Sequence, residues 1–158
     1  MKETIASQII QKIDEVAELY HRLILIVAPS NTGKTLALQS VHERLDAPLI
    51  NINLELSRRM LDLTLRQRIL QLPQLLLEII SESQADVILL DNIEILFDIS
   101  LKQDPLRLLQ SLSRSNTVVA AWNGSVEKEN ITYASPDHPE YRRYPIKDLI
   151  ILSPGMMD

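Results

Sequence analysis

The sequence predicts a three-layer α/β fold built on a mainly parallel five-stranded sheet. Segments that favour strands alternate along the chain with segments that favour helices, which is the order of repeated strand–helix–strand units. Several strand segments are continuous aliphatic runs, which are typical of parallel strands buried on both faces. Of the 158 residues, 46% are hydrophobic and 23% are charged, as in an ordinary globular protein. We therefore expect a single domain over residues 1–158.

The first part of the fold begins with an amphipathic helix within residues 1–20. Its apolar residues recur at helical spacing with charged residues between them: Ile5, Ile9, Ile13, Val16 and Tyr20. The aliphatic run 23–27 predicts the first strand, and the run 36–45 has a helical pattern. Residues 49–53 predict the second strand, which gives the order expected of a strand–helix–strand unit.

The middle of the chain continues this alternation. The stretch 54–83 is rich in Leu, Arg and Gln and predicts helices. We expect Pro73 at the first position of the last of these helices, where its missing N–H costs nothing. Residues 87–91 predict the third strand, which ends in an acid. A short helix is expected over 105–113, with Asp104 as its N-cap.

The last part of the chain has a weaker pattern. Residues 117–122 predict the fourth strand, and prolines interrupt the polar segment 125–145 that follows. Residues 146–152 are expected to contain a short final strand.

The composition excludes several classes of site. The formal net charge is −5, so the chain as a whole lacks the basic surface of a nucleic-acid-binding protein; a local patch, or one assembled by oligomerisation, stays open. The absence of cysteine excludes disulfides, thiolate metal sites and cysteine nucleophiles. The acidic N-terminal helix is not a signal peptide, and the run 23–28 is too short to span a bilayer. We therefore expect a cytoplasmic protein without membrane contact.

The segment after the first strand has the spacing of a phosphate-binding loop, small-x-x-x-x-Gly-Lys-Thr, with Ala28 where Gly is usual. Backbone N–H groups of such a loop surround phosphates, Lys34 can reach the outer ones, and Thr35 offers its hydroxyl to Mg²⁺. We expect ATP or another nucleoside triphosphate, with Mg²⁺, to be bound by one continuous segment: Ala28, Pro29, Ser30, Asn31, Thr32, Gly33, Lys34, Thr35 and Leu36. The alternative is an ordinary strand-to-helix turn with a solvated lysine.

The acid that ends the third strand, Asp91, resembles that of a Walker B strand. Such an acid faces the ligand crevice, so Asp91 can hold Mg²⁺ together with Thr35; a helix cap or turn residue is the alternative. Many P-loop ATPases have a glutamate directly after this acid, which polarises the attacking water. This chain has Asn92 there, which cannot accept a proton. Glu94 can take that role if the chain turns suitably, or it is a solvated acid. Slow or partner-completed hydrolysis follows as a hypothesis.

Polar residues beyond the third strand supply further candidates. Asn123 stands where AAA+ ATPases have a residue that contacts the γ-phosphate or the attacking water, and the alternative is a turn at Asn123-Gly124. Arg114, Arg142 and Arg143 are candidates for an arginine that stabilises the transition state. For each of them the alternative is a solvated surface arginine.

Together these residues resemble the BrxF family, the small P-loop proteins of BREX phage-defence systems. The likeness covers nearly the whole chain. The P-loop is generic, whereas the stretches Trp-Asn-Gly at 122–124 and His-Pro-Glu-Tyr-Arg at 138–142 suggest this family in particular. More broadly, the layout is similar to the nucleotide-binding core of AAA+ proteins. The resemblance implies ATP-dependent work in a bacterial cytoplasm, beside other defence-system proteins that act on DNA.

The expected fold is an AAA+-like core without the helical lid domain, because the chain stops soon after its last predicted strand. Another subunit or protein then has to cover the nucleotide. We expect a homo-oligomer, as a ring or partial ring, in which Arg114, Arg142 or Arg143 acts on the next protomer's nucleotide. An ATPase or NTP-driven switch is the first functional interpretation. The alternatives are a small P-loop kinase and a non-hydrolysing structural subunit, which Asn92 favours.

Overall fold

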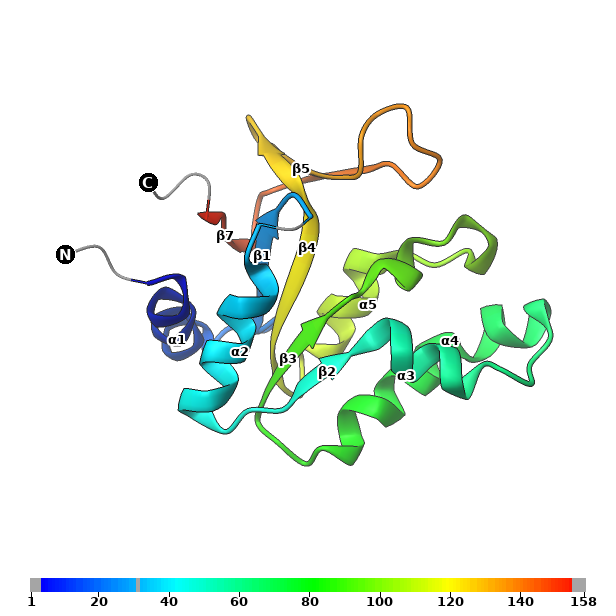
Figure 1. The fold of residues 1–158 in the computed structure, drawn as a ribbon, viewed down its shortest axis with the longest axis horizontal. Coiled ribbons are helices and arrows are strands. Elements are labelled where there is room, and N and C mark those ends of the chain that lie inside the picture. The colour runs from blue at the N-terminus through cyan, green and yellow to red at the C-terminus, as the bar shows by residue number, and fades with distance from the viewer. Residues whose placement is uncertain (1–3, 31, 155–158) are drawn as a thin grey trace.

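The core of the fold is a sheet whose five central strands are parallel. The computed structural model describes residues 4–30 and 32–154. The central strands lie in the order β2-β3-β4-β1-β7 (Figure 1). Their bounds are β1 Leu23–Ala28, β2 Leu49–Asn51, β3 Val87–Asp91, β4 Thr117–Glu127 and β7 Ile150–Leu152. The predicted α/β fold with a mainly parallel sheet is confirmed, although the sheet in the described residues has seven strands and not the five that the sequence predicted.

Helices cover both faces of this sheet and produce three layers (Figure 1). On one face lie α1 Ile5–Val16 and α2 Lys34–Leu45; on the other lie α3 Ile52–Arg59, α4 Leu65–Glu82 and α5 Pro105–Leu112. Two short 3₁₀ helices, η1 Glu94–Phe97 and η2 Ile99–Leu101, follow β3. In β1, Leu23 and Leu25 face α3, α4 and α5, whereas Ile24 and Ile26 face α1 and α2. Burial on both faces explains why the run carries no polar alternation.

Helix α4 contains Pro73 in its interior, so the prediction that this proline begins a helix is wrong. A proline inside a helix has no N–H to donate to the carbonyl four residues earlier, which here is Ile69. The side-chain amide of Gln103 donates to that carbonyl instead, with an N–O distance of 3.0 Å. A distant side chain therefore satisfies the carbonyl, and the helix continues through the proline.

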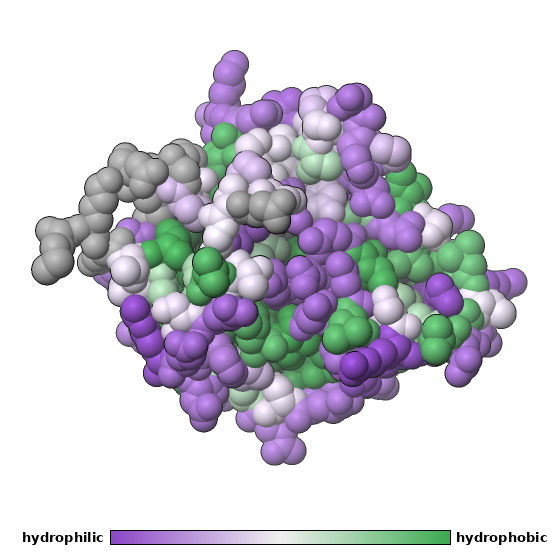
Figure 2. All heavy atoms as spheres, in the orientation of Figure 1, coloured by the Kyte–Doolittle hydropathy of each residue, from purple (hydrophilic) through white to green (hydrophobic). Residues whose placement is uncertain are grey.

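The α3–α4 side of the molecule presents apolar side chains to solvent. Five leucines there are at least 46% exposed: Leu54, Leu61, Leu65, Leu70 and Leu77. Figure 2 shows hydrophobic residues among hydrophilic ones on this side. Helix α4 thus buries one stripe against the sheet and exposes leucines on another. Within the described residues, no helix has the length and apolar content needed to cross a membrane.

The segment after Asn123 is more regular than the sequence predicted. Strand β4 does not end at Trp122 but continues to Glu127. Its extension pairs with β5 Asn130–Tyr133, which in turn pairs with β6 Arg142–Pro145. The polar segment 125–145 therefore contains antiparallel strands, and the alternative of a turn at Asn123-Gly124 is wrong. Gly124 is required here because a Cβ would lie 1.6 Å from the backbone oxygen of Thr132. We call residues 124–145 the hairpin arm.

Candidate active site

The candidate site lies where three neighbouring parallel strands end. The P-loop follows β1, Asp91 ends β3, and Asn123 lies in β4 directly opposite Ala28 of β1. Because β4 lies between β3 and β1, the topology brings these residues together at one edge of the sheet. A cavity of about 420 Å³ occupies this edge and is lined by residues of all three segments: Ser30, Thr32, Gly33, Lys34, Thr35, Leu36, Asp91, Asn92, Glu94, Ala121 and Asn123.

The loop itself ends in a glycine with a left-handed backbone. Gly33 has φ 91° and precedes α2, whose first residue is Lys34. This conformation strains any residue with a side chain, which explains why the motif has a glycine at this position. The Thr32 hydroxyl donates to the Pro29 carbonyl at 2.5 Å and closes the loop on itself. Ser30 and Leu36 are exposed beside the cavity, and Asn31 lies outside the described residues.

The Lys34 side chain is buried in this loop. Its Nζ donates to the carbonyl oxygens of Ala28, at 2.7 Å, and Pro29, at 2.5 Å. Burial lowers the pKa of Lys34 below its ordinary value of 10.5, and the carboxylates of Asp91 and Glu94 partly oppose that shift. The ammonium group is therefore held by carbonyl dipoles at the place where phosphate oxygens bind in a P-loop.

Thr35 and Asp91 form the second contact of the site. The Thr35 hydroxyl donates to the Asp91 carboxylate at 2.6 Å, and the other oxygen of Asp91 accepts the backbone N–H of Asn92 at 2.9 Å. A hydroxyl and a carboxylate side by side are the hard oxygen ligands that Mg²⁺ prefers. In the part of the chain that the structure describes, no group of three His, Asp or Glu residues converges to hold a metal without a ligand. The pair fits a magnesium ion that takes its other ligands from phosphates and water.

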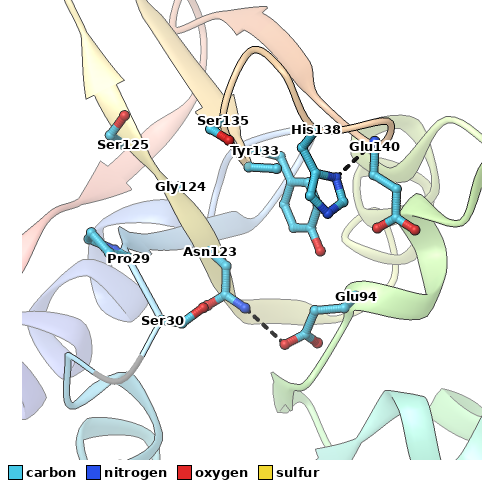
Figure 3. Close-up of a pocket in the computed structure, with 11 residues that line it drawn as sticks. Pro29, Ser30, Glu94, Asn123, Gly124, Ser125, Tyr133, Ser135, His138 and Glu140 are labelled. Atoms are coloured by element: carbon cyan, nitrogen blue, oxygen red, sulfur yellow. Dashed lines mark hydrogen bonds between the residues drawn. The ribbon is translucent and has the colours of Figure 1, made fainter.

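Glu94 and Asn123 form the third contact. The Asn123 amide donates to one carboxylate oxygen of Glu94 at 2.8 Å (Figure 3). The Asn53 amide donates to the other oxygen at 3.3 Å, and its own side-chain oxygen accepts the N–H of Ile95 at 2.8 Å. The structure thus brings the two sequence candidates into direct contact. Asn53 was missed: the sequence predicted it as the last residue of the second strand, whereas it lies in the first turn of α3.

Comparison with known families agrees with this geometry. The model of the AAA family, ATPases associated with various cellular activities, matches residues 24–121. The chain belongs to the AAA family. It is therefore a P-loop nucleotide-binding domain of the ATPase class, and the match covers the P-loop, Asp91 and Glu94.

Among solved structures, the AAA domain is similar to PCH-2 of C. elegans, with 14% sequence identity and a TM-score of 0.41. That similarity covers 94% of this chain, which spans 40% of the other chain. No curated protein matches the sequence.

A second cavity of about 500 Å³ adjoins the first and shares Ser30, Glu94 and Asn123 with it. The hairpin arm forms its opposite wall, with side chains that the sequence did not single out for this site: Tyr133, Ser135, His138 and Glu140 (Figure 3). Glu94 therefore lies between the phosphate loop and the hairpin arm. The second cavity thus extends the site from the end of the P-loop to the hairpin arm.

The three candidate arginines lie elsewhere on the AAA domain. The guanidinium of Arg114 lies over the ring of Tyr20 at 5.4 Å, before the start of β4 and at the opposite edge of the sheet from the P-loop. Arg142 donates to the backbone oxygen of Gln103 at 2.8 Å, and Arg143 is exposed on β6. Among the described residues that line the two cavities there is no arginine.

Proposed function

We propose that this AAA domain binds ATP with Mg²⁺ and hydrolyses it slowly, or rapidly only when a partner completes the site. The observation that carries the proposal is the contact between Asn123 and Glu94 at 2.8 Å, in the cavity that also contains Lys34, Thr35 and Asp91. A carboxylate held by an amide at this position supports water activation, whereas simple nucleotide storage needs no such pair.

Binding rests on the P-loop. The backbone of residues 28–36 surrounds the phosphate chain, and the Lys34 ammonium exchanges its two carbonyl partners for phosphate oxygens. Thr35 and Asp91 would hold Mg²⁺, which would supply positive charge against the phosphates. The direct bond between Thr35 and Asp91 opens for this purpose, and both oxygens stay on the cavity wall.

Hydrolysis rests on Glu94 in place of the usual adjacent glutamate. Its carboxylate accepts a proton from a water molecule while the water oxygen bonds to the γ-phosphorus. The bond from that phosphorus to the bridging oxygen breaks, and ADP and inorganic phosphate leave. Asn123 orients Glu94 and the γ-phosphate region, while Asn92 takes no proton because an amide cannot act as a base.

Association with other copies supplies the missing positive charge. An arginine that stabilises transferred phosphate typically raises turnover by a factor of about 10³–10⁵. We infer that Arg114, Arg142 or Arg143 of a neighbouring protomer reaches this cavity in a ring or partial ring. The exposed leucines on α3 and α4 support association, since apolar side chains grouped on a surface often mark contact sites. A protein that stays monomeric with ATP and Mg²⁺ at micromolar concentration would contradict this.

We also propose a biological setting, in which the AAA domain serves a multi-protein BREX phage-defence system in a bacterial cytoplasm and reaches DNA through its partners. The support is the sequence resemblance at 122–124 and 138–142, two stretches that flank the second cavity. Phage plating on a bacterial host that carries the complete system tests it. Lys34→Ala should abolish protection, and full protection by that variant would refute a nucleotide-dependent role.

The biochemical test follows phosphate from labelled ATP, alone and with candidate acceptors. Free phosphate supports the ATPase. A labelled acceptor would instead indicate a small P-loop kinase, and tight binding without turnover a non-hydrolysing subunit. Lys34→Ala should abolish binding, whereas Glu94→Gln should bind ATP and lose turnover. Glu140→Gln is the matched control, because Glu140 is a carboxylate of the second cavity that does not line the first. Equal turnover in Glu94→Gln and the wild type would remove Glu94 from the mechanism.

A further inference from the structure

Most aromatic residues of this chain lie close to the hydrogen-bonded pair Glu94 and Asn123. The sequence has one Trp, one Phe and four Tyr, and the buried core elsewhere is mainly Leu, Ile, Val and Ala. Four of the six aromatic side chains form one cluster: Phe97, Trp122, Tyr133 and Tyr144. Such a concentration in an aromatic-poor chain calls for a local cause.

The cluster reaches both partners of the hydrogen bond through the chain. Phe97 ends the short helix η1 that begins at Glu94, and Trp122 directly precedes Asn123 in β4. Tyr133, from β5 of the hairpin arm, lies against both. Its ring is parallel to that of Phe97, with centroids 3.5 Å apart and 5° between the planes. It meets Trp122 edge to face at 6.1 Å, and Phe97 meets Trp122 edge to face at 5.1 Å.

The hairpin arm is fixed to this cluster by a polar contact as well. The indole N–H of Trp122 donates to the backbone oxygen of Thr132 at 3.0 Å, next to Tyr133 in β5. Phe97 and Trp122 are fully buried, and Tyr133 is 6% exposed. Rings packed this closely have little freedom to turn, so a displacement of β5 moves η1 and β4 with it.

Tyr133 also lies close to the carboxylate itself. It lines the second cavity with Glu94 and Asn123 and projects toward Glu94 in Figure 3. Burial raises the pKa of Tyr133 well above its ordinary value of 10.0, and the charges of Glu94 and Glu140 act in the same direction. Tyr133 is therefore a neutral phenol at any physiological pH, and it adds no charge to the cavity.

We propose that Tyr133 is a positioning residue for hydrolysis, whose ring stack on Phe97 holds Glu94 against Asn123. The hairpin arm then sets the rate of the chemical step without touching the nucleotide. The inference rests on the proposed ATPase function, because it assigns Glu94 a part in turnover. It accounts for the placement of the aromatic residues, which general packing of the arm against the sheet does not require.

The test compares three variants within the cluster and holds a fourth in reserve. Tyr133→Leu removes the stack, and we expect kcat to fall by about tenfold or more while the Kd for ATP stays within about threefold. Tyr133→Phe keeps the ring and should retain kcat. Tyr144→Leu is the control, because Tyr144 packs on Trp122 from β6, with ring centroids 5.8 Å apart, but lines neither of the two cavities. It should lower thermal stability and leave kcat unchanged. Phe97→Leu breaks the same stack from the other side and serves if Tyr133→Leu does not fold.

The outcomes separate positioning from its alternatives. Unchanged kcat in Tyr133→Leu overturns the proposal. An equal loss in Tyr133→Phe also overturns it by assigning the effect to the hydroxyl, and an equal loss in Tyr144→Leu does so by assigning it to general destabilisation. The side-chain amide signals of Asn123 in ¹⁵N NMR give a readout that needs no turnover. They should shift both in Tyr133→Leu and in Glu94→Gln, and stay in place in Tyr133→Phe. A wild type without phosphate release would refute the ATPase, while these signals would still decide whether Tyr133 positions Glu94.

Discussion

Replacing Asn123 with alanine isolates the contact on which the proposed mechanism depends. The variant loses the amide that donates to Glu94 at 2.8 Å. A hydrogen bond to a charged group contributes about 1.5–3 kcal/mol. The lower end applies here because Glu94 is only partly buried and keeps the longer bond from Asn53. If about 1.5–2 kcal/mol is lost from the transition state alone, kcat falls by about 10–30-fold.

Single-turnover phosphate release measures this loss, and the affinity for ATP is measured separately. Titration calorimetry measures this affinity. The Kd should change by less than about threefold, because this bond joins two protein side chains, whereas binding rests on the P-loop and Lys34. Ser125→Ala is the control, since Ser125 lies two residues further along β4 and bonds to Thr132 instead. Wild-type kcat in Asn123→Ala, or a loss that appears only in Kd, would refute the reasoning.

Three further predictions concern the fold and the phosphate loop. Gln103→Ala leaves the Ile69 carbonyl without its donor, so urea unfolding should show a loss of about 1 kcal/mol, and an unchanged midpoint would mean that water replaces the amide. Gly124→Ala places a Cβ 1.6 Å from the Thr132 oxygen; overpacking costs about 1–3 kcal/mol, so the melting temperature should fall, and wild-type stability would contradict the close approach. ATP affinity should fall as pH rises through the lowered pKa of Lys34, below 10.5, because phosphate binds the ammonium form and the free loop loses that proton first. Titration calorimetry in buffers of increasing pH measures this, and a constant affinity up to pH 10.5 would exclude the titration of Lys34.

The strands and the P-loop were predictable because their signals are local. Strands β1 and β3 are aliphatic runs, as expected of buried parallel strands, and residues 28–35 have the spacing of a phosphate-binding loop in one continuous segment. Parallel topology then places Asp91 and Asn123 beside that loop, since β4 lies between β3 and β1. Local pattern and general sheet rules together were sufficient for the fold and for the outline of the site.

The errors have non-local causes. Proline is common at the first position of a helix, whereas the donor that satisfies the Ile69 carbonyl inside α4, Gln103, lies some thirty residues further along the chain. The hairpin arm was missed because its strands are short and polar, and because Pro136, Pro139 and Pro145 suggested irregular structure. Asn53 gains its place in the site from a contact across 41 residues, which no periodicity in the sequence records.

Asn92 illustrates how a local departure from a motif can be compensated by geometry. In sequence it counts against hydrolysis, because it occupies the position of the usual glutamate. In the structure its φ is 51°, in the left-handed region that asparagine adopts more readily than most residues with side chains. The chain therefore turns directly after Asp91, the Asn92 carbonyl accepts the N–H of Asn53 at 2.8 Å, and η1 begins at Glu94 opposite Asn123. A glutamate at position 92 would be strained in this conformation. A base placed directly after Asp91 would also not need this turn to reach the cavity. The asparagine and the displaced glutamate are thus parts of one arrangement, in which the residue that cannot accept a proton makes the turn that brings Glu94 to the cavity.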